Sequence, residues 1–319
     1  MAVWLACDCA RLVAERALPS LPGLGLGCAS MGNLFHPMTD TGARSILDLA
    51  WERGIRYFDT APHYGPATSE LRLGDFLRGV PRSEVFVSSK VGRLVVPTDD
   101  PRAEPEAMFV VDNGLSRRRD YSAAGIRESI ERSLERLNIA YLDLALVHDP
   151  EDHLDQALAE SIPALEALVS EGLVRRVGVG TNSDEVAAHL ASTGRLDAVL
   201  LAGRYTLLAQ GPPAVLGIAA AHHTHVIAAG VFNSGILARP GGRFDYRAVP
   251  PELLASVARL RLVCSRFAVD LPAAALQFVR REARVGTVLL GPGTAAQLSE
   301  LLDWLDEPIP EELWGELAA

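Results

Sequence analysis

Short hydrophobic segments alternate with amphipathic helical patterns along almost the whole chain of 319 residues. Each segment has the length of a β-strand, and the apolar residues after it recur three and four positions apart, as on one face of a helix. Eight such units follow one another without a break in composition, which predicts an α/β protein folded as a single closed (β/α)8 barrel, the TIM barrel. The expected strands are 24–28, the run that ends at Asp59, 85–90, 142–147, 174–180, 198–202, 225–229 and 286–290.

An open, doubly wound sheet is the main alternative to a barrel. Such a sheet normally opens its first helix with a Gly-x-Gly-x-x-Gly turn that binds a dinucleotide. Gly23, Gly25 and Gly27 instead occupy alternate positions in and beside the first expected strand, so their spacing does not match. The sequence therefore favours the barrel, in which active sites lie at the carboxyl ends of the strands.

Composition restricts the classes of partner. A net charge of −10 argues against binding to nucleic acid or to an anionic membrane surface. The N-terminal residues lack the apolar core of a signal peptide, and no apolar run is long enough to span a bilayer. We therefore expect a cytoplasmic protein with a single domain over residues 1–319. The oligomeric state does not follow from the sequence.

The four cysteines, Cys7, Cys9, Cys28 and Cys264, show no pattern of a disulfide framework. Cys7 and Cys9 have no further soft ligands beside them, so they do not indicate a zinc site. We expect ordinary thiols in a reducing compartment and no metal.

Four titratable residues fall at the same end of successive strands. Asp59 ends the second expected strand, Tyr64 lies in the loop after it, Lys90 ends the third strand and His148 follows the fourth. Singly, each could be a capping, packing or solvated residue, but together at one end of consecutive strands they indicate an active site. We expect Lys90 to lower the pKa of the Tyr64 phenol below 10, and Asp59 to hold Lys90 charged and in place.

This order of residues resembles the tetrad of the aldo-keto reductase superfamily, and the likeness extends from Gly25 to about Leu302. The resemblance implies an enzyme that transfers a hydride between a substrate carbon and a nicotinamide. Tyr64 would act as the general acid or base, and His148 would bind the substrate oxygen.

The resemblance also assigns cofactor contacts to three loops. Asn182 matches the family asparagine that bonds the nicotinamide carboxamide, with Thr181 in the place of a common serine. The loop after the seventh strand would lie along the pyrophosphate, where small residues allow the backbone to come close. The residues implied are Thr181, Asn182, Phe232, Asn233, Ser234, Gly235, Leu237, Gly291, Thr294 and Gln297.

Two positions depart from the pattern of many family members. Ala229 stands where a tyrosine often stacks on the nicotinamide, and Ala202 stands where a glutamine is common. Phe232 and Tyr205 are therefore the alternative stacking residues.

Several loop motifs are similar to those of one branch of the superfamily. They include Asn33-Leu34-Phe35, Val147-His148-Asp149-Pro150 and Val231-Phe232-Asn233-Ser234-Gly235. The branch contains L-fucose (D-threo-aldose) 1-dehydrogenases and pyridoxal 4-dehydrogenases, which oxidise a cyclic hemiacetal to a lactone. The resemblance therefore implies oxidation of the anomeric carbon of a small aldose. Asn33 and Arg204 are the candidates for contacts with sugar hydroxyls, and an ion pair to a neighbouring acid is the other interpretation of Arg204.

Other functions stay open on the sequence. The same catalytic groups would serve an NADPH-dependent reductase of aldehydes and ketones, or a pyridoxal 4-dehydrogenase. The superfamily also includes potassium-channel β subunits, which bind nicotinamide and act mainly as partner subunits. The complete tetrad favours an enzyme.

NAD is the expected cofactor, with NADP as the alternative. In the resembled family the cations that bind the 2′-phosphate of NADP lie just after the eighth strand, whereas this chain has no Lys or Arg from Val285 to its end. A cation from elsewhere, such as Arg117, could supply the missing charge. Arg117 belongs to residues 91–121, which we predict to be an irregular lid over the barrel mouth. We interpret the arginine run 117–119 as a solvated face.

Overall fold

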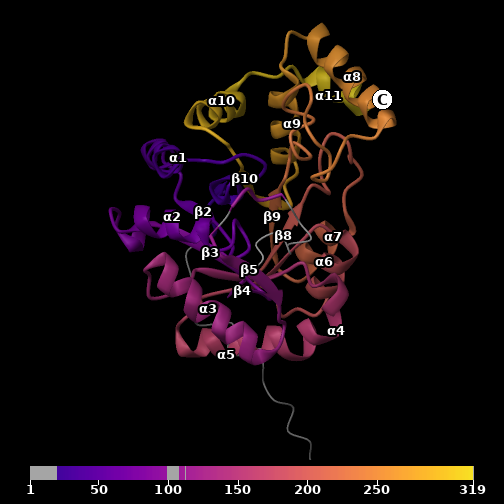
Figure 1. Cartoon of the computed structure of the whole chain (residues 1–319). Helices are drawn as coiled ribbons and strands as arrows, with labels where there is room; N and C mark the ends of the chain where they lie inside the picture. The colour runs from indigo at the N-terminus through magenta and orange to yellow at the C-terminus, as the bar shows by residue number, and fades with distance from the viewer. Residues whose placement is uncertain (1–19, 99–107, 112, 319) are drawn as a thin grey trace, which may run out of the picture.

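The computed structural model describes residues 20–98, 108–111 and 113–318 of the chain. Eight parallel strands close into a barrel in the order β1-β10-β9-β8-β7-β6-β3-β2, with helices around it (Figure 1). The (β/α)8 barrel expected from the alternating pattern is therefore confirmed. The barrel strands are β1 Leu24–Gly27, β2 Tyr57–Asp59, β3 Phe86–Val91, β6 Leu144–His148, β7 Val177–Thr181, β8 Ala198–Ala202, β9 His225–Ala229 and β10 Val285–Leu290.

The helices cover the outside of the barrel, and most of them bury their apolar faces in one large core. They are α1 Asp40–Glu52, α2 Thr68–Leu77, α3 Ala123–Leu137, α4 Leu154–Gln156, α5 Ile162–Glu171, α6 Asp184–Ala191, α7 Ala214–Ala221, α8 Pro251–Arg266, α9 Leu271–Arg280, α10 Ala295–Asp306 and α11 Glu311–Ala318. A second apolar cluster lies between α8, α9 and α11 on one side of the barrel (Figure 1). Within the described ranges no single helix is long and apolar enough to cross a membrane, although α8 and α9, bent at 95°, meet that test as a pair.

Some element boundaries differ from those expected. Thr39, not Asp40, caps α1, because Thr39 Oγ1 accepts a hydrogen bond from Gly42 N at 3.1 Å. Asp40 is instead the first helical residue, where a negative charge is favourable. Strands β6 and β7 begin later than expected, because Leu142 and Val174 form only an isolated bridge.

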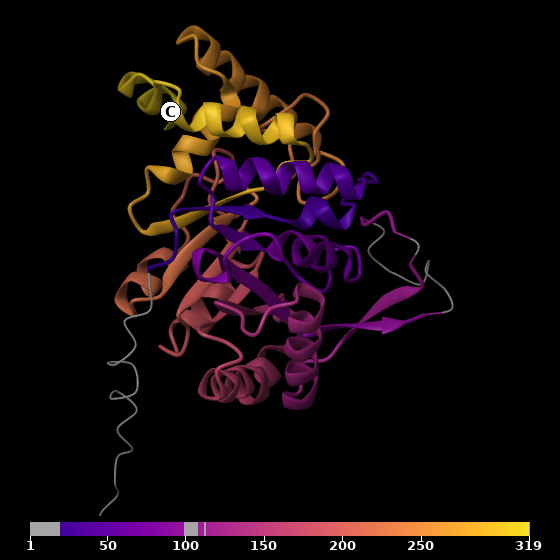
Figure 2. The same cartoon turned by 90° about the vertical axis from the view of Figure 1, so that its left-hand side faces the viewer.

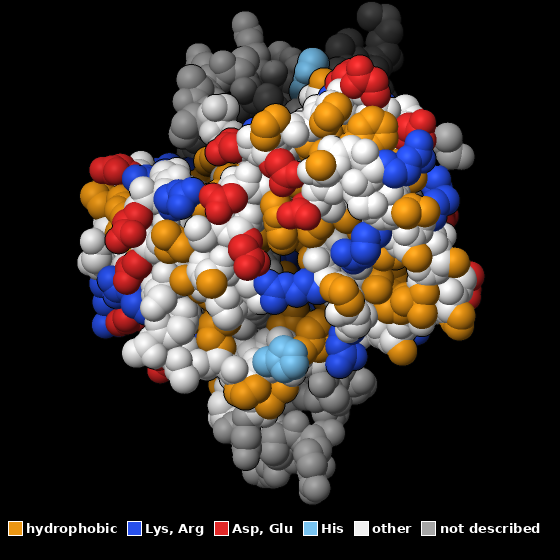
Figure 3. Space-filling model, turned by 90° about the horizontal axis from the view of Figure 1, so that it is seen from above, with side chains coloured by type: hydrophobic (Ala, Val, Ile, Leu, Met, Phe, Trp, Pro, Cys, Tyr) orange, Lys and Arg blue, Asp and Glu red, His pale blue; other side chains and the backbone are white. Residues whose placement is uncertain are grey.

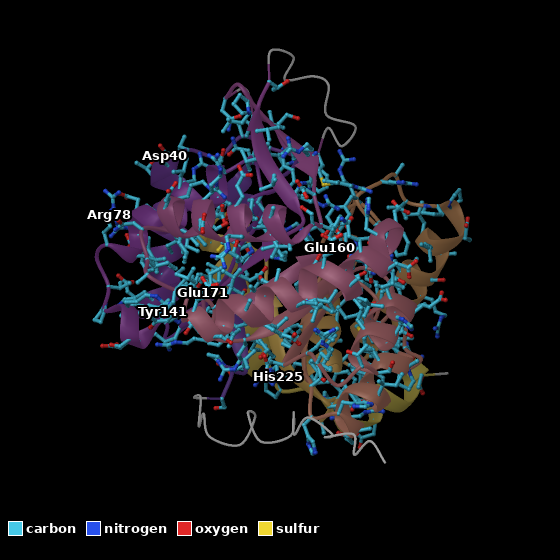
Figure 4. All side chains as sticks on the ribbon, turned by 90° about the horizontal axis from the view of Figure 1, so that it is seen from below. Asp40, Arg78, Tyr141, Glu160, Glu171 and His225 are labelled. Carbon is cyan, nitrogen blue, oxygen red and sulfur yellow. The ribbon has the colours of Figure 1, made fainter. Side chains whose placement is uncertain are left out.

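Hydrophobic side chains fill the inside of the barrel. The ring of Tyr57 packs edge-on against Phe86, with centroids 4.7 Å apart. At the amino ends of the strands, His225 Nε2 lies 2.8 Å from Thr287 Oγ1. Figure 4 shows His225 near the end of the molecule opposite to the β4–β5 hairpin described below. This packed interior separates the amino end of the barrel from the polar residues at the carboxyl ends of its strands. The residues that pack there are Tyr57, Phe86, Leu144, Leu146, Ala198, Leu200, Ile227 and Leu289.

Part of the predicted lid is regular structure, which corrects the expectation of an irregular segment. Strands β4 Arg93–Pro97 and β5 Leu115–Arg119 form an antiparallel hairpin that projects from the barrel (Figure 2). Residues 108–110 return to the barrel and pair with 33–35, with Phe35 N donating to Met108 O at 2.6 Å. Residues 99–107 and 112 of the predicted lid lie outside the described residues.

Cys28 and Cys264 are buried free thiols. Burial raises the pKa of Cys264 to about 11, so this thiol stays protonated at neutral pH. Cys7 and Cys9 lie outside the described residues.

Candidate active site

A cavity of about 220 Å³ opens at the carboxyl ends of the barrel strands. Its wall contains Tyr64, Lys90 and His148, together with Thr181 and Asn182 from the end of β7 and the next loop. These residues come from separate β/α units, so closure of the barrel is what brings them together.

Asp59 and Lys90 form a buried ion pair at the ends of β2 and β3. Lys90 Nζ donates to Asp59 Oδ2 at 2.7 Å and to the carbonyl of Thr60 at 2.9 Å. Ser88 Oγ donates to the other carboxylate oxygen, Asp59 Oδ1, at 2.7 Å. The pairing of β2 with β3 sets this contact, because it places Asp59 opposite Ser88. The ammonium therefore has a fixed position and a matched charge.

The loop after β2 brings Tyr64 against this ion pair. Lys90 Nζ lies 4.7 Å from the centroid of the Tyr64 ring. Gly32 and Gly65 let the loop approach, because their backbones are in contact and a Cβ on Gly65 would overlap Gly32 O. Gly65 also has a φ of +60°, which other residues rarely adopt. The position of Tyr64 thus depends on close packing of two loops.

Burial decides the protonation state of the Tyr64 phenol. It raises the pKa of Tyr64 above its ordinary value, and Lys90 lowers that pKa by less. The expectation of a pKa below 10 is therefore wrong for the protein alone. Burial also lowers the pKa of Lys90, but Asp59 and Tyr64 together raise it by more, so the ammonium stays charged. The resting site holds a neutral phenol beside a charged lysine.

His148 ends β6 beside Tyr64, with their ring centroids 6.1 Å apart. Tyr121 OH holds the strand end, because it donates to the carbonyl of His148 at 2.6 Å. Burial lowers the pKa of His148 well below its ordinary value, and Arg93 and other cations add to the effect. The imidazole is therefore neutral at pH 7, and its Nδ1 is buried with no partner in the part of the chain that the structure describes.

A polar cluster next to His148 was not predicted from the sequence. Arg93 Nη2 donates to Asp149 Oδ2 at 2.6 Å, and Arg93 Nη1 lies 3.1 Å from His63 Nε2. Arg117 Nη1 lies 3.2 Å from the same nitrogen, so the interpretation of Arg117 as part of a solvated face is wrong. His63 and Asp149 each adjoin a tetrad residue in the sequence, which is the signal that could have found them.

Comparisons with known proteins show the family of the chain. Residues 23–319 match the profile of the aldo/keto reductase family. The chain belongs to the aldo/keto reductase family. It is 43% identical to a D-threo-aldose 1-dehydrogenase of a Pseudomonas species over 94% of each chain, and 37% identical to a pyridoxal 4-dehydrogenase of Microbacterium luteolum over 93% of each. Among solved structures it is similar to the aldo-keto reductase AKR11C1 from Bacillus halodurans, with a TM-score of 0.73, 25% identity, and coverage of 93% of this chain and 91% of that one.

In this aldo/keto reductase, Thr181 and Asn182 are the predicted cofactor residues on the cavity wall. The Thr181 hydroxyl is already engaged, because it donates to Glu151 and accepts from Ser183 N at 2.9 Å. Asn182 is therefore the better candidate of the two for bonding a carboxamide.

The loop after β9 carries the predicted pyrophosphate contacts. Ser234 Oγ accepts from Tyr246 N at 3.0 Å, and Tyr246 in turn lines the cavity. Asn233 Nδ2 donates to Gly203 O at 3.1 Å, whereas Asn233 Oδ1 is buried without a partner among the described residues. Gly235 has a φ of +102°, which suits glycine. The loop thus combines a tight backbone turn with one unsatisfied acceptor.

Neither aromatic residue proposed to stack on the nicotinamide lines the cavity. Phe232 packs against Trp304, with ring centroids 6.3 Å apart, and Tyr205 packs against Phe278 at 5.0 Å. Leu237, from the same loop as Phe232, is fully buried. The aromatic side chains that line the cavity are Tyr64, Phe109 and Tyr246, together with the imidazoles of His63 and His148.

Three more predicted cofactor residues lie between the end of β10 and the first turn of α10. Thr294 caps the helix, since its Oγ1 accepts from Gln297 N at 3.1 Å. The Gln297 side chain reaches back and accepts from Gly293 N at 2.7 Å. Gly291 has open space where a Cβ would lie. The arrangement is a helix N-terminus with little side-chain bulk before it.

The predicted substrate residues have other partners. Asn33 Oδ1 accepts from Arg72 at 2.8 Å and Asn33 Nδ2 donates to Val110 O at 3.0 Å, so this amide joins the first loop to residues 108–110. Arg204 forms an ion pair with Asp245 at 3.0 Å, which confirms the alternative expectation of an ion pair to a neighbouring acid. Neither side chain is part of the cavity wall. A contact of Asn33 or Arg204 with a sugar hydroxyl therefore stays a prediction.

The raised pKa of Tyr64 can be measured directly. A pKa above the ordinary value of 10 means that the phenol keeps its proton to higher pH. We expect the ultraviolet difference titration of wild type against Tyr64→Phe to show no phenolate from Tyr64 up to pH 10. A phenolate that is lost in the variant and titrates below pH 10 would show that Lys90 outweighs burial.

Proposed function

We propose that this protein is an NAD-dependent dehydrogenase that oxidises the anomeric carbon of a small aldose, such as L-fucose, to the lactone. The observation that carries the proposal is the buried Asp59–Lys90 pair beside Tyr64 and His148 in one cavity. The likeness to a D-threo-aldose 1-dehydrogenase over nearly the whole chain supports the choice of substrate.

A nicotinamide cofactor fits the residues beside the cavity. Asn233 Oδ1 is a buried acceptor without a partner among the described residues, Asn182 lines the cavity, and Gly291 leaves open space before α10. The N-terminus of α10 offers backbone N–H groups to a phosphate. An oxidised nicotinamide held by these residues would supply the hydride acceptor for the substrate carbon.

Tyr64 is the proton acceptor in this proposal. Oxidation of a hemiacetal removes a proton from its hydroxyl, and Tyr64, which is neutral in the resting site, has to lose its own proton to solvent before it takes up this one. Lys90 stabilises the phenolate when it forms, and Asp59 keeps Lys90 in place. His148 is neutral and can donate a hydrogen bond to the substrate oxygen without competing for the proton.

Oxidation of pyridoxal is the second candidate function. The 37% identity to a pyridoxal 4-dehydrogenase over 93% of each chain favours it. The aromatic rings of Phe109 and Tyr246 on the cavity wall would also suit a flat pyridine ring.

Turnover of L-fucose with NAD tests the proposal. We expect the wild type to form the lactone, and Tyr64→Phe to lower kcat at least about 100-fold, because the ring stays while the proton acceptor is lost. Tyr141→Phe is the matched control: Tyr141 stacks on Arg82 and Arg175 away from the cavity and should keep wild-type kcat.

The same assay, extended to a panel of aldoses, pyridoxal and simple aldehydes, identifies the alternatives. Oxidation of pyridoxal but of no aldose would establish the second candidate. Activity confined to aldehyde reduction with NADPH would indicate a reductase. Binding of nicotinamide without turnover of any compound would indicate a partner subunit.

Acidic residues on α10 support NAD over NADP. Two cations from other elements lie near this helix, and each is matched by an acid: Arg239 lies 3.0 Å from Glu300 and Arg53 lies 3.8 Å from Asp303. Figure 3, which views this side of the molecule from above, shows acidic and basic side chains close together. Arg117, the cation considered for this role, contacts His63 instead. An added 2′-phosphate would therefore meet no net positive charge from these pairs.

We expect kcat/KM for NAD to exceed that for NADP at least about tenfold, which corresponds to about 1.4 kcal/mol. The measurement varies each cofactor at saturating sugar. Glu300→Ala removes the acid that pairs with Arg239 and should reduce the kcat/KM preference for NAD over NADP. Glu316→Ala breaks the exposed pair with Arg266 and should leave that preference unchanged. Equal efficiency with both cofactors in the wild type would contradict the prediction.

A further inference from the structure

Asp149 and Arg93 form a polar pair on the cavity wall beside His148. Arg93 Nη2 donates to Asp149 Oδ2 at 2.6 Å, and both residues line the cavity. The side chains are largely buried, with 8% of Arg93 and 23% of Asp149 exposed. The same carboxylate oxygen lies 3.4 Å from His148 Nε2. The pair therefore lies next to His148, the side chain proposed to hydrogen-bond the substrate oxygen.

The backbone holds Asp149 in this orientation. Its φ is +45°, in the left-handed region that Asp and Asn tolerate better than most residues. Asp149 N donates to Gly180 O at 2.8 Å, and the single proton of Tyr121 OH is shared between the carbonyls of His148 at 2.6 Å and Asp149 at 2.8 Å. An unfavourable backbone conformation that is fixed by several contacts at a cavity suggests a functional role for the side chain.

We propose that Asp149 and Arg93 bind a hydroxyl on the carbon next to the reacting carbon, so that the enzyme selects 2-hydroxy aldehydes and the aldoses that contain them. A carboxylate accepts a hydrogen bond from the hydroxyl, and a guanidinium donates one to the hydroxyl oxygen. Tyr64 and His148 take the oxygen of the reacting carbon, so the neighbouring hydroxyl lies within reach of the pair beside His148. The inference rests on the proposed function and specifies its substrate class.

A positioning role is the competing account of Asp149. If the carboxylate acted only by orienting His148, its loss would slow every substrate by the same factor. Recognition of a hydroxyl instead predicts a loss that falls mainly on substrates that carry it, because such sites discriminate strongly against analogues that lack the group. The two accounts differ in selectivity rather than in total activity.

Two pairs of compounds that differ by this one hydroxyl test the inference. They are 2-hydroxypropanal with propanal, reduced with the reduced cofactor, and L-fucose with 2-deoxy-L-fucose, oxidised with NAD. Asp149→Asn keeps the shape and backbone preference of the residue and removes its charge. We expect it to lower kcat/KM for the hydroxylated member at least about tenfold more than for its partner.

Asp152→Asn is the matched control, because Asp152 pairs with Arg119 at 3.0 Å on the surface and its side chain is 77% exposed. In this control the ratio of kcat/KM between the two members of each pair of compounds should stay as in the wild type. Arg93→Lys is a second variant, which retains the charge, loses the planar fork and should shift both ratios in the same direction as Asp149→Asn. Thermal unfolding of each variant checks that it is folded.

An equal loss on both members of each pair would overturn the inference and leave Asp149 with a role through His148. If Asp149→Asn is inactive on all four compounds, the ratios of Arg93→Lys decide, and unchanged ratios overturn the inference. The pair 2-hydroxypropanal and propanal tests the hydroxyl site independently of whether the protein oxidises L-fucose. A protein that fails to oxidise L-fucose, but loses its preference for 2-hydroxypropanal in Asp149→Asn, would refute the aldose dehydrogenase and retain the hydroxyl site.

Discussion

The buried ion pair between Asp59 and Lys90 is the contact on which the candidate active site depends. Two charges can be removed from water only when they are paired and further hydrogen-bonded, and here Ser88 and the carbonyl of Thr60 complete the set. Removal of one partner would leave an uncompensated buried charge, at a cost of about 3–5 kcal/mol. The barrel therefore has to close with β2 beside β3, and the same closure places Tyr64 and His148 at one cavity.

Burial disfavours the charged form of each titratable group at this site. It favours the neutral phenol of Tyr64 and the neutral imidazole of His148. Lys90 stays charged, because Asp59 and Tyr64 more than offset the effect of burial on its pKa. The neutral side chains of Tyr64 and His148 thus lie beside the fixed positive charge of Lys90. Such a charge would stabilise a Tyr64 phenolate that forms during proton transfer.

The sequence predicts those features whose cause is local. Most barrel strands are short apolar runs, helices such as α1 and α3 bury one apolar face, and the tetrad residues end strands or lie in the loops after them, so these features could be inferred from short segments. The hairpin could not, because β5 reads Leu115-Ser116-Arg117-Arg118-Arg119 and takes its strand conformation from pairing with β4. Asn33 and Arg204 show the limit of this inference, because the sequence places a loop side chain only by its position in the chain, whereas their partners come from distant segments. Tyr246 was missed for the same reason.

In the proposed reaction the substrate loses a hydride from its anomeric carbon while Tyr64 takes the hydroxyl proton. L-fucose with deuterium at C1, incubated with the wild-type protein and NAD, tests it most directly. The account predicts that the deuterium appears at C4 of the reduced nicotinamide in the same amount as the lactone formed. Reduced nicotinamide without deuterium, or a product that keeps deuterium at C1, would contradict it.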